Sequence, residues 1–168
     1  MKDPIQKLRI KKVDLELKDL INSGIKGLTP YEPGKPIEDL EREYGIKKAI
    51  KLASNESPLG PSPKVIEALK EIISGINRYP DGNGSRLKEA LSSRHSLSAD
   101  TLTLGNGSND IIEFVARCFL TPNDNAVYSK HAFAVYPLVT QSLGAQGVEV
   151  EARDWGHDLQ AMLDAVNN

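Results

Sequence analysis

The feature that most constrains the fold is a regular alternation of short apolar segments and helical segments in the second half of the chain. In the longer segments the apolar residues recur at helical spacing, while the shorter segments have the length of strands. Such alternation is typical of a parallel sheet with helices on its faces, so the sequence predicts an α/β fold built from βαβ units. The expected strands are residues 101–104, 126–129 and 148–152, and the expected helices that follow them are 109–119, 133–143 and 158–166.

The predicted sheet looks incomplete. Three strands are few for a sheet of this class, and the sequence stops inside the last predicted helix with "DAVNN". So small a sheet would expose its edge and part of its faces, which native domains usually avoid. The sequence therefore indicates the beginning of a larger domain.

The first part of the chain is predicted to form an amphipathic arm, residues 1–30, ahead of the domain. Four apolar residues share one helical face and Gly24 is the stop signal, so the arm is expected to be helical. These four residues are Val13, Leu17, Leu20 and Ile21. A short helix is expected over residues 37–44, where Gly45 ends it, followed by a short strand over residues 50–53.

Two further helices follow loops rich in proline and glycine. Ser62 and Pro63 suit the N-cap and first-turn positions of one helix, and residues 85–95 form the other. The first of these helices has an apolar face that we expect to be buried. That face consists of Val65, Ile66, Leu69, Ile72 and Ile73.

Composition excludes several classes of function. The formal net charge is −2 and the basic residues are scattered, so nucleic acid is not an expected partner. No apolar run approaches the roughly 20 residues that span a bilayer, and no signal segment is visible, so a cytoplasmic location is expected. The single cysteine, Cys118, is expected to be a buried thiol on a helix. The histidines at 95, 131 and 157 lack metal-ligand spacing, so no metal site is expected.

The turn "LGNGSND" joins the predicted strand 101–104 to the helix that follows it. In open α/β sheets ligands gather at the carboxyl ends of strands. The first amides of the helix, the Ser108 hydroxyl and the helix dipole favour an anion, and Gly105 and Gly107 let the backbone approach it closely. The turn lacks the spacing of dinucleotide-binding and P-loop motifs. Taken alone, it is interpreted equally well as a tight connection without a ligand.

Four aromatic residues lie where they can serve a site. Phe133 and Tyr136 begin the helix after the second strand, where either can stack on a planar ring or fill the core. Tyr79 in "NRYPDGNG" and Tyr31 in "LTPYEPGKP" lie in irregular loops, where a phenol suits hydrogen bonding better than packing.

Five stretches of the chain occur in the same order in one known family: "LTPYEPGKPI", "KLASNESPLGPSP", "NRYPDGNG", "LGNGSNDIIE" and "KHAFAVYPL". From about Gly24 to its end, the chain resembles the N-terminal portion of histidinol-phosphate aminotransferases. The resemblance implies a fold-type I pyridoxal-phosphate enzyme, a homodimer that exchanges an amino group between histidinol phosphate and 2-oxoglutarate in histidine biosynthesis. It also implies that residues 31–168 are part of the large, cofactor-binding domain, whose second half and the C-terminal small domain are absent.

The resemblance implies roles for residues that bind the cofactor, pyridoxal 5'-phosphate. Gly107, Ser108 and Asn109 would hold its phosphate at the start of a helix. Phe133 would stack on its pyridine ring. Tyr79 would reach the phosphate of the cofactor held by the other subunit.

Tyr31 and Asn55 would border the substrate. The family's chemistry also depends on a lysine that forms a Schiff base with the cofactor, and on an aspartate and an arginine, all in the second half of a full-length enzyme. No lysine of this chain lies in a matching motif, so no catalytic residue is assigned and the chain alone is expected to be inactive. Two other hypotheses stay open: a non-catalytic phosphate-binding or interaction module, and a truncated product without a function of its own.

Overall fold

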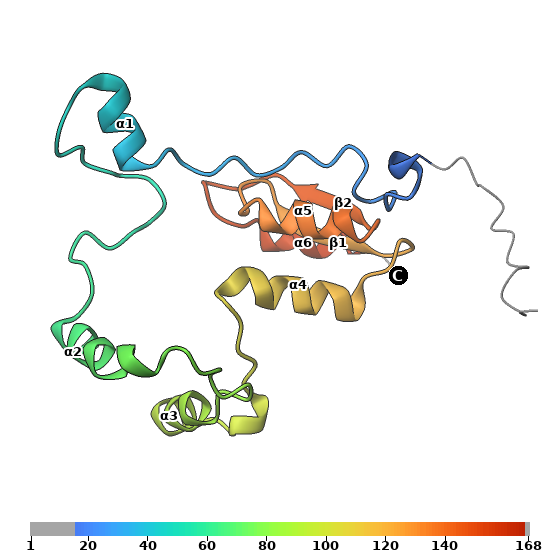
Figure 1. The fold of residues 1–168 in the computed structure, drawn as a ribbon. Coiled ribbons are helices and arrows are strands. Elements are labelled where there is room, and N and C mark those ends of the chain that lie inside the picture. Colours follow the sequence, from blue (N-terminus) through green and yellow to red (C-terminus); the bar gives the residue numbers. More distant parts are fainter. Residues whose placement is uncertain (1–15, 167–168) are drawn as a thin grey trace, which may run out of the picture. The chain divides into compact units, whose positions relative to one another are not determined.

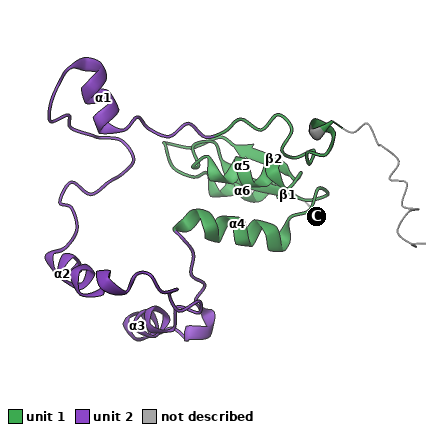
Figure 2. Ribbon diagram, viewed as in Figure 1, with its two compact units in different colours: residues 1–30, 107–168 green, residues 31–106 purple. Residues whose placement is uncertain are grey.

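The structure, a computed structural model, describes residues 16–166 of the chain (Figure 1). These residues form two compact units, each of which is described by itself (Figure 2). Unit 1 holds residues 16–30 and 107–166, and unit 2 holds residues 31–106.

Unit 1 contains a 3-10 turn, three α-helices and two strands. In chain order these are η2 (Leu17–Asp19), α4 (Ser108–Phe119), β1 (Asn125–Ser129), α5 (Val135–Ser142), β2 (Gln146–Val150) and α6 (Leu159–Asp164). Unit 2 contains helices and loops. Its elements are α1 (Ile37–Tyr44), α2 (Pro63–Ile72), η3 (Ile73–Gly75), α3 (Ser85–His95) and η4 (Ala99–Thr101).

The sheet of unit 1 is parallel. β1 and β2 pair from Asn125 opposite Gln146 to Ser129 opposite Val150. Helix α5 connects the two strands and packs against both, so that β1, α5 and β2 form one βαβ unit. Helix α4 packs against α5, and α6 packs against β1 (Figure 1). The predicted α/β class with parallel strands is confirmed.

The core of unit 1 is small. Among the described residues, the buried apolar side chains are Ala116, Val135 and Ala145. Two polar residues, Ser129 and Thr140, are also buried, and the Thr140 hydroxyl donates to the Tyr136 carbonyl at 2.8 Å. Beside this core, residues of α4, β1 and α5 line an apolar groove of about 410 Å³. The expectation that so small a sheet leaves part of its surface open is confirmed here.

Six predicted helices are present, and two of them have clear boundary signals in the sequence. Helices α1 and α3 match the predicted ranges, and α2, α4, α5 and α6 differ from prediction only near their ends. Gly45 ends α1 in the left-handed conformation (φ 63°), which glycine adopts at little cost. The Asp158 carboxylate caps α6 by accepting the Ala161 amide at 3.0 Å.

Two of the predicted strands, 50–53 and 101–104, are wrong. The structure has irregular backbone at 50–53, and a 3-10 turn at 99–101 followed by residues to 104 that belong to no strand. A strand must pair its backbone with a neighbour, and the sheet of the described chain consists of β1 and β2. The other two strands are confirmed, β1 beginning one residue and β2 two residues before the prediction.

The predicted helical arm is wrong within the described residues, and Val13 lies outside them. Only the 3-10 turn η2 forms, and Leu20 and Ile21 are exposed. The Asn22 side chain accepts the Gly24 amide at 3.0 Å, a local bond that competes with a helix. Gly24 itself is buried, and a Cβ added to it would lie 2.4 Å from the Gln141 carbonyl oxygen. Close packing of this turn on the end of α5 therefore overrides the helical periodicity.

Two predictions of burial are also wrong. The apolar face of α2 is exposed, from 41% at Ile66 to 65% at Ile73, because unit 2 provides no surface that covers it. Val65, Leu69 and Ile72 are likewise exposed. Cys118 is exposed on α4, because the small core of unit 1 leaves that part of the helix open.

Candidate functional site

Helix α4 begins at Ser108, directly after a glycine whose backbone conformation other residues rarely adopt. Gly107 has φ 82° and ψ 178°, a region that is essentially restricted to glycine. The space next to the Gly107 Cα is open, since a Cβ at Gly107 would meet no atom within 4 Å. The predicted turn therefore depends on Gly107 for its conformation rather than for space.

The first amides of α4 can donate to a ligand. The opening N–H groups of a helix have no partner inside it, and the N-cap residue, Gly107, has no side chain that could cap α4. Within the described part of the chain, the amides of Ser108 and Asn109 donate to no backbone or side-chain acceptor. Together with the positive end of the helix dipole, two adjacent free N–H groups favour an anion.

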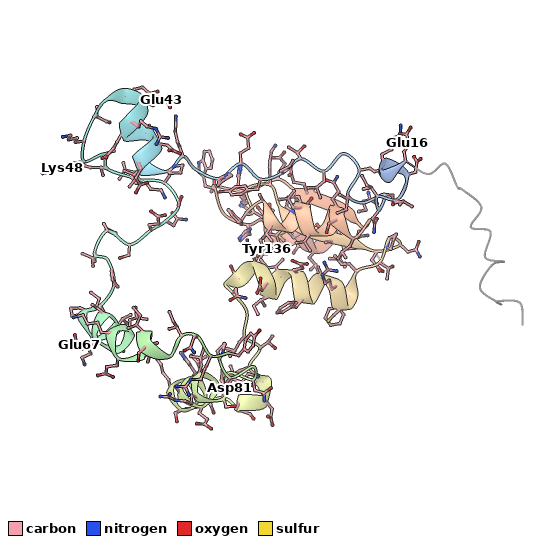
Figure 3. All side chains as sticks on the ribbon, in the orientation of Figure 1. Glu16, Glu43, Lys48, Glu67, Asp81 and Tyr136 are labelled. Atoms are coloured by element: carbon pink, nitrogen blue, oxygen red, sulfur yellow. The ribbon has the colours of Figure 1, made fainter. Side chains whose placement is uncertain are left out.

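Phe133 lies in the loop between β1 and α5, at the carboxyl end of β1. It is 53% exposed and lines a groove of about 470 Å³. The loop is ordered by hydrogen bonds: the Ala132 amide donates to the Ser129 carbonyl at 2.8 Å, and the Tyr136 amide to the Phe133 carbonyl at 3.1 Å. Tyr136, labelled in Figure 3, is 41% exposed and lines the same groove. Neither aromatic ring is a core residue, so both are accessible to a planar ligand.

Lys130, in the same loop as Phe133, is paired with a carboxylate. The Lys130 ammonium contacts the Glu151 carboxylate at 2.5 Å. This hydrogen bond and the charge of Glu151 raise the pKa of Lys130 above its ordinary value, and Glu149 adds to the effect. Lys130 is therefore held as a cation next to a carboxylate, which does not suit an amine that must act as a nucleophile.

The other predicted site residues belong to unit 2. Tyr79 is fully exposed, Tyr31 is 53% exposed, and Asn55 has a left-handed backbone (φ 50°). The loop after Tyr79 is held by Asp81, labelled in Figure 3, whose carboxylate accepts the Ser85 amide at 2.7 Å. The same carboxylate also accepts the Asn83 amide at 3.0 Å, and these bonds lower the pKa of Asp81. Gly107, Ser108, Asn109 and Phe133 thus share unit 1, while Tyr31, Asn55 and Tyr79 share unit 2.

Three further residues line the grooves at the carboxyl ends of the strands. His131 and His157 line the groove that holds Phe133, and His131 and Trp155 line a neighbouring hollow of about 320 Å³. The rings of His131 and Trp155 stack with centroids 5.4 Å apart and planes at 27°. Sequence reasoning weighed the histidines only as metal ligands and missed Trp155, since nothing local in the sequence joins residues 131 and 155.

Between residues 16 and 166, no helix has the length and apolar character that crossing a bilayer requires. Among those same residues, histidine, cysteine and acidic side chains form no group of three or more that could hold a metal ion.

No family model matches the chain. Three relatives, each named histidinol-phosphate aminotransferase, are similar to nearly all of it. Those from Nitrosococcus oceani and Pseudomonas aeruginosa are 55% identical over 149 and 150 residues, which is 89% and 88% of this chain but 40% and 41% of theirs. That from Methylobacillus flagellatus is 54% identical over 154 residues, which is 90% of this chain and 42% of its own. The chain spans about two fifths of the length of these relatives.

Solved structures agree with this relationship. The histidinol-phosphate aminotransferase from Sinorhizobium meliloti, solved in complex with pyridoxal-5'-phosphate, matches 80% of this chain with a TM-score of 0.72 and 27% identity. The match covers 36% of that protein. A putative histidinol-phosphate aminotransferase from Erwinia carotovora atroseptica shares the fold over 66% of this chain, with a TM-score of 0.62 and 24% identity. The α/β fold of unit 1, with its small parallel sheet, is thus a partial domain of the pyridoxal-phosphate aminotransferase type. By sequence and fold, the chain is similar to the N-terminal portion of histidinol-phosphate aminotransferases.

Proposed function

We propose that the chain supplies the cofactor-phosphate site of a pyridoxal-phosphate-dependent histidinol-phosphate aminotransferase. The whole enzyme would exchange an amino group between histidinol phosphate and 2-oxoglutarate in histidine biosynthesis. The observation that carries the proposal is the start of α4, where a glycine-only backbone conformation precedes two adjacent amides that are free to donate. The names of the relatives support the choice of substrate.

The residues present in unit 1 fit the cofactor. Its phosphate is a dianion that needs several donors, and the amides of Ser108 and Asn109 with the Ser108 hydroxyl provide three on one helix end. The accessible face of Phe133 suits a planar heteroaromatic ring. When bound, pyridoxal phosphate supplies an electron sink for the bonds of the substrate's amino carbon. This chain's own residues would bind and orient it.

The remaining assignments are parts of the same proposal. Tyr79 would donate its phenol to the cofactor phosphate of the partner subunit of a cytoplasmic homodimer, which suits a fully exposed side chain on an ordered loop. Tyr31 and Asn55 would border the substrate. Residues 31–168 would belong to one large cofactor-binding domain of the complete enzyme.

We further propose that this chain does not transaminate by itself. Transamination needs an amine that reacts with the cofactor and then moves a proton, and Lys130, which lies in the same loop as Phe133, is held as a cation by Glu151. The test mixes the purified chain with pyridoxal phosphate and excess histidinol phosphate and follows the absorbance of the cofactor. A rate equal to the protein-free control is expected. A clearly faster conversion that is lost in Phe133→Ala would contradict the proposal.

Cofactor binding is tested by a pair of substitutions at one position. Ser108→Pro removes the amide and the hydroxyl while keeping a residue that the first turn of a helix accepts. Ser108→Ala removes only the hydroxyl. Titration with pyridoxal phosphate is expected to show affinity lowered about tenfold or more by Ser108→Pro, and less by Ser108→Ala, because hydrogen bonds to charged groups are worth ~1.5–3 kcal/mol. Equal affinity in Ser108→Pro and the unchanged chain would refute this site.

The same titration addresses the alternative of a non-catalytic phosphate-binding module, which the free amides by themselves also favour. Such a module would bind inorganic phosphate as tightly as pyridoxal phosphate, since only the helix start would be used. The proposed site predicts tighter binding of pyridoxal phosphate, and predicts that Phe133→Ala removes that difference while leaving the affinity for inorganic phosphate unchanged.

A further inference from the structure

We propose that Trp155 is a positioning residue, which holds the β1–α5 loop in the conformation that presents Phe133 by stacking on His131. The proposal concerns the structure of this loop. It rests on the proposed function only for the role of Phe133 toward the cofactor ring.

Two neighbouring residues of the β1–α5 loop contact the end of β2 and the segment that follows it. Lys130 binds that segment twice: its amide donates to the Val150 carbonyl at 2.8 Å, and its ammonium contacts the Glu151 carboxylate at 2.5 Å. His131 then stacks on Trp155, with ring centroids 5.4 Å apart. The contact of Lys130 lies at the strand end, whereas that of His131 lies two residues before Phe133. The stack is therefore a side-chain attachment of the loop that lies close to Phe133 in the sequence.

Trp155 is held in this place by a tight turn of unusual composition. The Arg153 amide donates to the Gly156 carbonyl at 3.1 Å, and the Gly156 amide donates back to Arg153 at 2.8 Å. Between them Asp154 (φ 51°) and Trp155 (φ 62°) both have positive φ. A two-residue turn of this kind favours asparagine or glycine, and tryptophan is a poor residue for it.

Burial of the Trp155 side chain in a core does not compensate for its unfavourable backbone conformation. Its side chain is 90% exposed, and the ring contact that the structure gives it is the stack on His131. His131 in turn lines both the hollow beside Trp155 and the groove that holds Phe133. His131 thus borders both the Trp155 hollow and the Phe133 groove, so we expect a change at Trp155 to act on the loop at Phe133 through His131.

Native-state hydrogen exchange of the full chain, followed by NMR, tests the proposal without any cofactor. The readout is the exchange rate of the Ala132 and Lys130 amides relative to the amides inside α4, so that a general loss of stability cancels. Trp155→Ala is expected to raise this relative rate about 2- to 12-fold. This range follows from the free energy that a stacked aromatic pair contributes. Trp155→Phe, which keeps a ring, is expected to restore a rate close to that of the unchanged chain.

Trp155→Gly separates the stack from the turn. Glycine suits the positive φ better than tryptophan, so the turn itself should tighten while the stack is lost. The proposal predicts that Trp155→Gly loosens the loop as Trp155→Ala does. Tyr44→Ala, which removes another exposed aromatic ring from α1 of unit 2, is the matched control and should leave the relative rate unchanged.

Two results would overturn the proposal. One is a relative exchange rate in Trp155→Gly equal to that of the unchanged chain, which would mean that the turn alone orders the loop. The other is an equal change in Trp155→Ala and Trp155→Phe, which would mean that ring stacking is not involved. Failure of the chain to bind pyridoxal phosphate would count against the proposed function, and it would leave these exchange rates as they are.

Discussion

Replacing Gly107 by alanine is expected to damage the anion site at the start of α4 more than it damages the fold. At φ 82° and ψ 178° an alanine is in a region that only glycine enters readily, which costs ~1–3 kcal/mol. A Cβ at this position meets no atom within 4 Å, so no clash adds to this figure. The whole penalty belongs to the backbone of one residue.

The chain can relieve that penalty by rotating the peptide that joins residue 107 to Ser108. This rotation moves the Ser108 amide, one of the two donors of the proposed site. We therefore expect Gly107→Ala to lower the affinity for pyridoxal phosphate about tenfold, together with a loss of at most ~1–3 kcal/mol in the free energy of unfolding.

Urea denaturation and titration with pyridoxal phosphate measure the two effects separately. Gly27→Ala is the matched control, because Gly27 also has a positive φ (77°) with no atom within 4 Å of an added Cβ, and lies in the same unit. The control should lose comparable stability and keep its affinity. The reasoning is refuted if Gly107→Ala binds pyridoxal phosphate as tightly as Gly27→Ala does.

Three further predictions concern the packing and the charge of the chain. Gly24→Ala should release the N-terminal turn from α5 and speed its proteolysis, because the added Cβ would lie 2.4 Å from the Gln141 carbonyl oxygen; an unchanged cleavage rate contradicts this contact. Gly147→Ala should destabilise the sheet by ~1–3 kcal/mol in urea, since its Cβ would lie 2.2 Å from the Tyr128 hydroxyl oxygen, and Tyr128→Ala should recover part of that loss. The lowered pKa of Asp81 means that its carboxylate stabilises the fold above pH 3.8, and that this contribution is lost as the pH falls through the lowered value. Urea denaturation of Asp81→Asn should show a weaker dependence on acid pH than the unchanged chain, and identical curves would show that these bonds contribute nothing.

The elements that sequence reasoning predicted well are those whose signals lie within a few residues. Gly45 and Asp158 each mark a helix end through their own conformation or side chain, and the structure confirms both. The start of α4 belongs to the same class, since Gly107 and the two residues after it define it locally. The phosphate role of that start stays a prediction.

The predictions that were wrong depended on contacts between distant residues. Segments 50–53 and 101–104 have the apolar character of strands, but a strand also needs a neighbour that the described sheet does not provide. The segment around Leu20 has helical periodicity but does not form an α-helix, because Gly24 packs closely on α5. The α2 face at Ile66 is exposed, because no surface of unit 2 covers it. The contact of Trp155 with His131 spans a strand and a helix, so no local pattern could have indicated it.

The central claim is that the start of α4 holds the phosphate of the cofactor. It is tested most directly by following the backbone amide resonances of the isotope-labelled chain while pyridoxal phosphate is added. We expect the largest shifts on the Ser108 and Asn109 amides, and we expect inorganic phosphate to move the same two resonances. In Ser108→Pro, the shift at Asn109 should need a pyridoxal phosphate concentration about tenfold higher or more. Shifts concentrated on lysine-rich surface segments, with the amides of Ser108 and Asn109 unmoved, would contradict this claim.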